Sequence, residues 1–425
     1  MSTTSNNALR SALIAACLLP VVSLGQGTDV EFSGHIKTWL NVDGYADDSV
    51  FYGLTGSNAG SLNTEIRLNL EVDRGNWSFE GAWQVYGAWG DRVELMREVG
   101  GISFPGVGHL PNDDRRLMNL TDVIYDEDNI AAVHRLDRLT ASYTTDKVVV
   151  RLGRQAISWG NGLIFSPMDI VNPFDPTTVD TEYKAGDDMV YAQYLRDNGD
   201  DFEFAHVVRR NLATGDVESD EATSALKYHG FAGQGEYDLL VAQHYGDTTI
   251  AVGGNRSVGG AIIHGDIVWT DTSSGSRTQL VANLSYSWVW GGRNVSGVVE
   301  YYFSDFGQRA GQYDLPSLVQ NTELLRRLER GEAFTLGRNY LAGAITVEMT
   351  PLWMLTPNLF ANLDDGSALL QLVSRNSLSD NSEILAALNL PLGPSGSEFG
   401  GIESPVPGTY FSTDFSVFAQ FAWYF

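Results

Sequence analysis

The side chains that could act as nucleophiles, general bases or metal ligands are present in this chain, but none stands in a recognised motif. Seven histidines and 53 acidic residues make a His–Ser or His–Asp pair available almost by chance. No histidine lies in the spacing or glycine context of a nucleophile site, and no cluster of His, Cys, Asp and Glu has metal-ligand spacing. We therefore expect no enzymatic activity, no metal and no cofactor.

Other charged residues are more informative, because they alternate with apolar ones. Between residues 64 and 72, Ile66, Leu68 and Leu70 alternate with Glu65 and Arg67. Successive residues of a β-strand point to opposite faces, so such a stretch has one apolar and one polar face. The pattern recurs at 77–89, 279–290 and 341–349, in stretches of about 9–13 residues, the length a tilted strand needs to cross a membrane. No run after residue 25 approaches the roughly 18 apolar residues of a transmembrane helix.

These elements predict an all-β fold, a transmembrane antiparallel β-barrel of about 18 strands within a range of roughly 14–18. The strands should begin near residues 31, 62, 77, 136, 148, 189, 201, 222, 236, 249, 261, 278, 294, 339, 353, 367, 382 and 411. We expect one domain over residues 26–425, because a barrel cannot be split into independent cores.

Connection lengths give this barrel an orientation. If the last strand descends to the periplasm, the periplasmic turns include the short segments 73–76, 144–147, 197–200, 233–236 and 379–381. Most connections on the other side are long, at about 45–60, 90–134, 160–186, 209–221, 307–338 and 393–410. Short periplasmic turns and long extracellular loops are typical of an outer-membrane barrel.

In such a barrel, charged residues opposite apolar positions should face the lumen. A basic residue on the lipid face costs roughly 2–4 kcal/mol at the membrane midplane. About 18 strands also enclose a lumen too wide for side chains alone to fill, which favours a channel. The pore-lining residues expected on this ground are Glu65, Arg67, Glu71, Glu80, Arg151, His264, Asp266, Glu300, Glu348 and Asp414.

The segment Gly153–Asp188 departs most from the strand pattern. Pro167, Pro173 and Pro176 forbid a regular ladder, and the segment is too apolar for a freely solvated loop. We expect it to fold inward and narrow the pore; packing over the rim or against a neighbouring subunit is the alternative. Arg151 and Arg154, beside this segment, would face acids across the pore. Trp159, Phe165 and Asp169 complete the constriction residues that we expect.

A second exception is Leu315–Arg330, whose leucines have helical spacing and which Gly331 follows as a C-cap. We expect one short helix in an extracellular loop, either as a lid or small plug or as a plain surface helix.

The two ends of the chain indicate export. Arg10, an apolar run and Ser23–Gln26 have the pattern of a signal peptide, cleaved after residue 25. A lipoprotein signal ending at Cys17 is the alternative. The last strand alternates to a final aromatic residue, and Phe421, Trp423 and Phe425 resemble the terminal assembly signal of outer-membrane barrels, read by the barrel-assembly machinery.

Charge limits the partners. Without Arg10, 26 basic residues face 53 acidic ones, a net charge of −27, so no nucleic acid should bind. The acids would attract cations or hold divalent ions near anionic lipid headgroups. Outer-membrane lipid and a small solute are the expected partners, and a homo-oligomer is left open.

The run Leu152–Gly160, with Phe165-Ser-Pro and Asn172-Pro-Phe-Asp175, resembles a group of uncharacterised porin-like outer-membrane proteins of Gram-negative bacteria. The Gly-Arg-Gln element is more distantly similar to substrate-selective and polysaccharide-export porins. The resemblance implies a barrel with a transport role and no catalytic residue.

We therefore expect an outer-membrane channel for small solutes, cation-preferring or neutral. The alternatives are an outer-membrane component that handles hydrophobic or lipidic substrates with an inner-membrane exporter, a structural or adhesive barrel, and an outer-membrane hydrolase.

Overall fold

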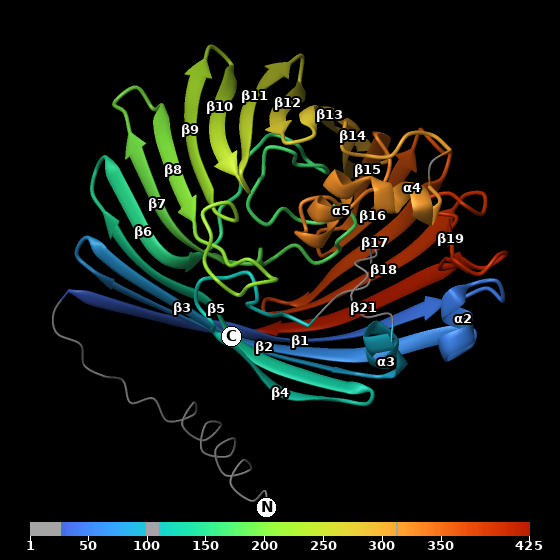
Figure 1. Ribbon diagram of the computed structural model, residues 1–425. Coiled ribbons are helices and arrows are strands. Elements are labelled where there is room, and N and C mark those ends of the chain that lie inside the picture. Colours follow the sequence, from blue (N-terminus) through green and yellow to red (C-terminus); the bar gives the residue numbers. More distant parts are fainter. Residues whose placement is uncertain (1–26, 99–109, 312) are drawn as a thin grey trace, which may run out of the picture.

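The computed structural model describes residues 27–98, 110–311 and 313–425, so the predicted signal peptide at 1–25 lies outside the described residues. Eighteen strands form a closed antiparallel barrel (Figure 1). The barrel runs from β1 through β2, β3 and β5 to β18 and β21, and β21 pairs with β1 to close it. The predicted all-β barrel and its strand number are confirmed. Each barrel strand begins within six residues of its predicted start.

The barrel strands are β1 (Thr28–Gly44), β2 (Asn58–Arg74), β3 (Trp77–Trp89), β5 (Ile130–Thr144), β6 (Val148–Gln155), β7 (Asp187–Leu195), β8 (Asp201–Val207), β9 (Thr223–Ala232), β10 (Gly235–His244), β11 (Asp247–Val258), β12 (Ala261–Thr272), β13 (Gly275–Trp290), β14 (Arg293–Ser304), β15 (Asn339–Thr350), β16 (Trp353–Asn362), β17 (Ala368–Ser379), β18 (Ser382–Leu392) and β21 (Phe415–Tyr424). The elements outside the barrel ring are α2 (Val50–Thr55), α3 (Asp91–Glu98), β4 (Thr121–Glu127), α4 (Leu315–Gln320), α5 (Thr322–Glu329), β19 (Ile402–Glu403) and β20 (Tyr410–Phe411).

Strand β4 was not predicted, and its position follows from the shortness of β6. The lower half of β5, from Leu139 to Thr144, pairs with β6. The upper half, from Ile130 to Arg135, has β4 as its partner on that side. The strand therefore supplies hydrogen-bond partners to a stretch of β5 that β6 does not reach.

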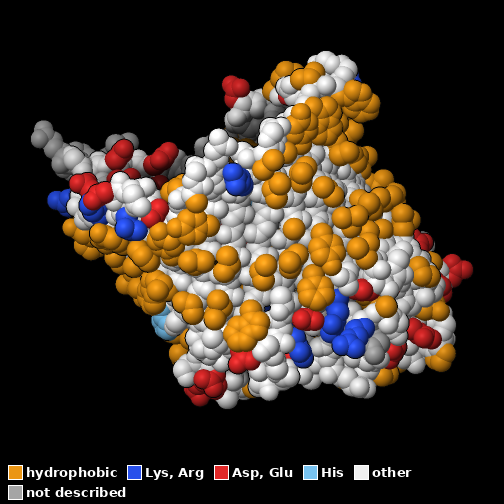
Figure 2. All heavy atoms as spheres, turned by 90° about the horizontal axis from the view of Figure 1, so that it is seen from above, with side chains coloured by type: hydrophobic (Ala, Val, Ile, Leu, Met, Phe, Trp, Pro, Cys, Tyr) orange, Lys and Arg blue, Asp and Glu red, His pale blue; other side chains and the backbone are white. Residues whose placement is uncertain are grey.

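Side chains on the barrel strands alternate between the lumen and the lipid. On β10, Asp238, Leu240 and Ala242 are buried inside, while Leu239 and Val241 between them are 44% and 49% exposed on the outside. Figure 2 shows hydrophobic side chains spread over the barrel face, with charged ones mostly toward its edges. This apolar exterior suits lipid. Among the described residues, no helix has the length and hydropathy needed to cross a bilayer.

All the long connections lie at one end of the barrel, together with the three short ones at 245–246, 273–274 and 363–367, and every connection at the other end is short, as the loop-length pattern predicts. At the short end, the turn between β13 and β14 consists of Gly291 and Gly292, with φ of 59° and 78°. Two consecutive positive φ values match the twist of a two-residue hairpin, and glycine adopts them without a steric penalty. The long loops at the other end fold back over and into the barrel (Figure 1).

The chain end completes the seam between β21 and β1. Phe425 exchanges two backbone hydrogen bonds with Gly34, of 2.9 and 3.0 Å. A Cβ at Gly34 would lie 2.7 Å from the Phe425 ring, so glycine is needed where the terminal ring packs. Phe421, Trp423 and Phe425 are exposed beside this seam, and their part in assembly stays a prediction.

Two expectations need correction. The helix predicted over Leu315–Arg330 is divided at Asn321, whose side chain caps α5 by accepting from the Leu324 amide. The last barrel strand begins at Phe415 instead of 411, because residues 410–411 pair with β19. Asp414 therefore lies exposed in a bend at the rim, bonded through its amide to the Gly44 carbonyl, and does not line the membrane-spanning lumen.

Candidate functional site

Residues 156–186, which connect β6 to β7, lie inside the barrel and are called the constriction loop below (Figure 1). The loop first packs on the inner wall formed by β7 to β12. Its buried apolar residues and the wall residues they pack against form one cluster of Ile157, Trp159, Met168, Ile170, Val171, Met189, Tyr191, Ala205, Val207, Ala225, Leu240, Ala242, Ala251 and Val268. The apolar composition of the loop is thus matched by an unusually apolar arc of wall.

Two wall carboxylates then bind the loop backbone. Asp266 accepts the Asn161 amide N–H at 2.7 Å. Glu300, fully buried, accepts the amides of Leu163 and Phe165 at 2.8 and 2.6 Å and that of Ile164 at 3.2 Å. These amides have no strand partner, so each carboxylate satisfies donors that would otherwise be buried unpaired.

Beyond Phe165, which stacks on Tyr302 with a 4.5 Å centroid separation, the loop crosses to the opposite wall. Gln371 on β17 donates to the Thr177 carbonyl at 2.8 Å. On β1, Lys37 Nζ lies 2.6 Å from Asp180 Oδ2 and 2.7 Å from Glu182 Oε2. The loop is therefore attached at both sides of the lumen.

The last part of the loop, residues 183–184, contacts the remaining part of the inner wall. The Tyr183 ring lies under the Arg67 guanidinium, 4.1 Å from its carbon. Lys184 then turns back to Asp169 of the same loop, at 2.6 Å. Burial raises the pKa of Asp169 to about 6, against the opposing effect of the Lys184 charge and hydrogen bond. From residue 161 to residue 184, the loop contacts β10 to β17 and then β21, β1, β2 and β5.

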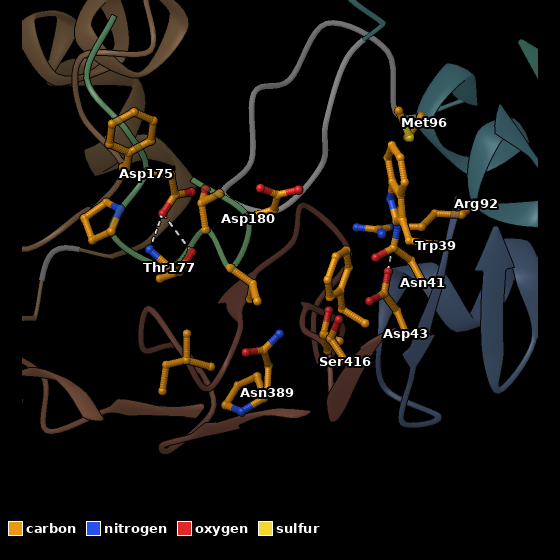
Figure 3. Close-up of a pocket in the computed structure, with 18 of the residues that line it drawn as sticks. Trp39, Asn41, Asp43, Arg92, Met96, Asp175, Thr177, Asp180, Asn389 and Ser416 are labelled. Carbon is orange, nitrogen blue, oxygen red and sulfur yellow. Dashed lines mark hydrogen bonds and ion pairs between the residues drawn. The ribbon is translucent and has the colours of Figure 1, made fainter. Parts of the chain in front are cut away.

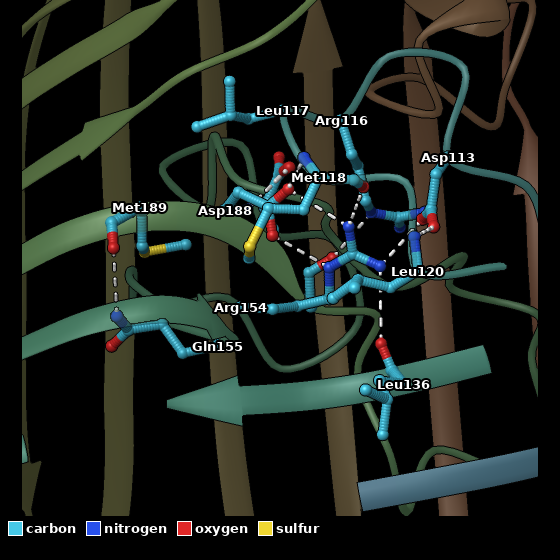
Figure 4. A network of polar contacts seen from close by, with 12 residues as sticks. Asp113, Arg116, Leu117, Met118, Leu120, Leu136, Arg154, Gln155, Asp188 and Met189 are labelled. Atoms are coloured by element: carbon cyan, nitrogen blue, oxygen red, sulfur yellow. Dashed lines mark hydrogen bonds and ion pairs between the residues drawn. The ribbon is translucent and has the colours of Figure 1, made fainter. Parts of the chain in front are cut away.

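The base of the loop is fixed by Arg154, the last residue but one of β6. Its guanidinium, 1% exposed, donates to Asp188 at 2.9 Å and to Asp113 at 2.8 Å. It also donates to the carbonyls of Met118 and Leu136 and makes a second hydrogen bond to Asp188. Five hydrogen bonds therefore converge on this one side chain (Figure 4). The segment 113–118 is thereby held against the start of the constriction loop.

A cavity of about 750 Å³ lies between the constriction loop and the opposite wall. In Figure 3, Trp39, Asn41 and Asp43 of the wall face Asp175, Thr177 and Asp180 of the loop across the open space. The cavity shares Asn41 with a second one of about 910 Å³ among the loops at the rim. On the β7–β12 side the loop is packed directly on the wall, so the open space is asymmetric.

The predicted site residues fall into separate groups. Glu65, Arg67 and Phe165 line the cavity. Trp159, Asp169, Asp266, Glu300 and Arg154 hold the constriction loop, and Trp159 does so by donating to Glu203 at 2.9 Å. Arg154 therefore does not face acids across an open pore, because both of its acids are buried with it; Arg151 is stacked on Tyr191 at 4.1 Å.

The remaining predicted residues lie toward the short-turn end. Glu71 and Glu80 are opposite each other in the β2–β3 register. His264 is opposite Asn255 and Asn283. Glu348 accepts from Asn294 at 2.7 Å. Glu71, Glu80 and Glu348 thus lie near the short turns. His264 lies beside the constriction loop, because Asn255 and Asn283 both donate to Asn161 of that loop at 3.4 Å.

Several contributing residues were missed. Lys37, Asp180 and Glu182 form the far attachment of the loop, and Arg135 with Asp137 lines the cavity. Lys37 alternates with apolar residues on β1, so the rule that selected Glu65 also applies to it. The two loop acids carried no comparable pattern.

Thr223, His244 and Glu332 are arranged in the order of a hydrolytic triad, but a substrate cannot reach them. Thr223 Oγ1 lies 2.8 Å from His244 Nδ1, and His244 Nε2 lies 3.1 Å from Glu332. Thr223 is fully buried and its hydroxyl accepts from Arg209 at 2.6 Å, so no substrate carbonyl can approach it. Among the described residues, no group of three or more His, Cys, Asp and Glu is arranged to hold a metal ion.

No protein-family model matches the sequence, and no curated protein matches it. The structure is nevertheless similar to solved barrels over nearly its whole length. The TM-score against Pseudomonas aeruginosa OccK5 (OpdH) is 0.54 at 10% identity, covering 93% of this chain and 98% of that one. Against Acinetobacter baumannii OccAB4 it is 0.52 at 8% identity, covering 94% and 99%. Against a BenF-like porin from Pseudomonas fluorescens Pf-5 it is 0.51 at 8% identity, covering 93% and 98%. The chain thus has the fold of an outer-membrane porin, which agrees with the resemblance found in its sequence.

Proposed function

We propose that this protein is an outer-membrane channel that passes small solutes between the constriction loop and the wall formed by β1, β2, β3, β18 and β21. One observation carries the proposal: the loop is bound around the inner wall, yet it leaves a cavity of about 750 Å³ on that side. Between the loop and the wall around His244, Val268 and Tyr302, the described residues leave a space of only about 50 Å³. A loop that narrows a wide barrel without filling it is the arrangement a selective channel needs. The porin fold of the structural neighbours supports a channel over an enzyme.

The charges along the cavity favour cations or neutral compounds. Each of its four basic side chains is close to a carboxylate: Lys37 to Asp180, Arg92 to Asp43 at 2.9 Å, and Arg67 and Arg135 both to Asp137, at 2.8 and 3.0 Å. The chain as a whole carries 53 acidic against 27 basic residues, so acids remain in excess after such pairing. An anion that enters thus meets paired cations and a net negative vestibule.

A cysteine placed in the cavity tests the path directly. Asn389 and Leu390 are neighbours on β18 that point to opposite faces; Asn389 lines the cavity and Leu390 is 37% exposed on the outside. In planar bilayers, Asn389→Cys should lose conductance on reaction with a bulky methanethiosulfonate reagent, whereas Leu390→Cys should not. A refolded protein with no discrete conductance would refute the channel, and equal responses of the two variants would refute the assigned path.

Ion selectivity is read in the same apparatus. Under a salt gradient, the reversal potential should have the sign of a cation-preferring pore, with a smaller value at high ionic strength because salt screens the loop charges. A clear anion preference would refute the charge argument and leave the channel itself standing.

A further inference from the structure

Aromatic and amide side chains occupy directly opposite positions on the wall of the cavity. In the β1–β21 register, Trp39 is opposite Gln420, and Asn41 is opposite Phe418. Tyr86 on β3 extends the set, with its ring centroid 5.8 Å from that of Trp39. All five side chains line the cavity. A solute lying on this wall therefore meets ring faces and amides in alternation.

The amides match hydroxyl groups better than they match charges. An amide presents both donors and acceptors, as a hydroxyl does, whereas a carboxylate or guanidinium presents only one kind. Asn389, two strands from Asn41 along the same wall, has a buried Oδ1 with no hydrogen-bond partner.

The charged groups beside these residues are already compensated. Arg92 pairs with Asp43, and Lys37 pairs with two carboxylates of the constriction loop. Burial raises the pKa of Asp175, the acid on the facing side of the cavity, and its carboxylate accepts from the Thr177 amide and hydroxyl at 2.8 and 2.7 Å. Arg67 and Arg135, which also line the cavity, pair with the carboxylate of Asp137, so every basic side chain along the cavity has an acidic partner.

The facing side of the cavity is made by Pro176–Asp180 of the constriction loop. Figure 3 shows Thr177 and Asp180 on one side of the space and Trp39, Asn41 and Ser416 on the other. The solute is therefore enclosed between a wall of rings and amides and a short segment of proline, threonines, valine and Asp180, whose carboxylate pairs with Lys37.

We propose that this wall is a binding site for a neutral polyhydroxylated ring, such as a mono- or disaccharide, during its passage through the channel. The proposal rests on the channel function above and names its substrate class. The C–H face of a sugar ring is apolar and packs on an aromatic face, while its hydroxyls at the ring edge both donate and accept hydrogen bonds. Rings and amides in alternation satisfy both requirements at once.

The test is single-channel recording in planar bilayers with D-glucose and with sucrose as probes. Either sugar should interrupt the current reversibly in a concentration-dependent way. Trp39→Ala should raise the half-blocking concentration roughly tenfold, since one ring face is worth on the order of the 1.4 kcal/mol that a tenfold change represents. Trp39→Phe should retain most of the block. The control is Trp77→Ala, which removes an exposed tryptophan at the outside of the barrel and should leave the block unchanged.

The outcomes separate the two proposals. A channel that conducts but is not interrupted by either sugar overturns the substrate class and leaves the channel intact. Block by sodium acetate or choline at lower concentration than by the sugars, with the same dependence on Trp39, also overturns it, because a charged solute would then be preferred. An absence of conductance overturns the channel function itself.

Discussion

The attachment of the constriction loop to Lys37 determines how wide the passage is, and it can be removed by one substitution. Lys37→Met keeps the length and apolar stem of the side chain but eliminates both ion pairs, to Asp180 and to Glu182. Asp180 and Glu182 then keep the hydrogen bonds from Gln420, at 3.1 Å, and from Tyr424, at 2.9 Å, as their contacts to the barrel wall.

The magnitude follows from the exposure of the two acids. A hydrogen bond to a charged group contributes about 1.5–3 kcal/mol. The carboxylates of Asp180 and Glu182 are 24% and 35% exposed, so water replaces part of what Lys37 provides. We therefore expect a loss of about 2–4 kcal/mol for the attached state, which raises the population of a detached tip roughly 30- to 700-fold.

Single-channel recording measures this change. The unmodified protein should show one main level, and Lys37→Met should add a second, larger level or frequent transitions to it. Lys147→Met is the matched control, because Lys147 pairs with Asp197 in a short turn far from the loop and is 48% exposed. If Lys37→Met kept the single level of the unmodified protein while its barrel remained folded, as judged by heat-dependent gel mobility, the reasoning would be refuted.

Four further outcomes follow. In acid, the unmodified channel should itself show the larger conductance level. Burial raises the pKa of Asp180, but the hydrogen bond and charge of Lys37 hold that pKa below its ordinary value overall. The attachment is therefore complete above about pH 4 and is lost as the pH falls through the lowered pKa. Glu300→Gln should lower the free energy of unfolding by about 2–3 kcal/mol, because one amide oxygen cannot accept from three backbone amides, while the exposed Glu71→Gln should be neutral in the same urea titration. Burial raises the pKa of Glu398 to about 7, so stability should fall by up to about 3 kcal/mol between pH 4.5 and 7, and Glu398→Gln should flatten that slope. Arg154→Met should cost about 3–5 kcal/mol, since two buried carboxylates lose their common partner; a smaller loss would mean that water reaches them.

The barrel could be predicted from the sequence because its determinants are local. The two faces of a strand follow from the alternation of neighbouring residues. The orientation of the barrel follows from the lengths of successive connections. Both are properties of short segments, so 18 strands and their orientation needed no knowledge of the pairing. The departures are local as well: β4 lacks a continuous pattern, and the alternation of 411–425 runs past the bend at Asp414.

The constriction site could be predicted only in part. Alternation assigns Glu300 to the inner face correctly, but it does not say what fills the space in front of it. Arg154 was expected to face a pore and is instead enclosed by Asp113 and Asp188, from a loop 41 residues earlier and from the next strand.

The sequence by itself therefore determined the barrel, its orientation and the segment that departs from the strand pattern. Tertiary structure alone decided where that segment attaches. Lys37 and Asp180 are 143 residues apart, and Gln420 and Asp180 are 240 apart, and only closure of β21 onto β1 brings all three to one point. The physical reason is that periodicity describes which way a side chain points from its own strand, whereas the width of the passage depends on which distant groups meet across the closed ring.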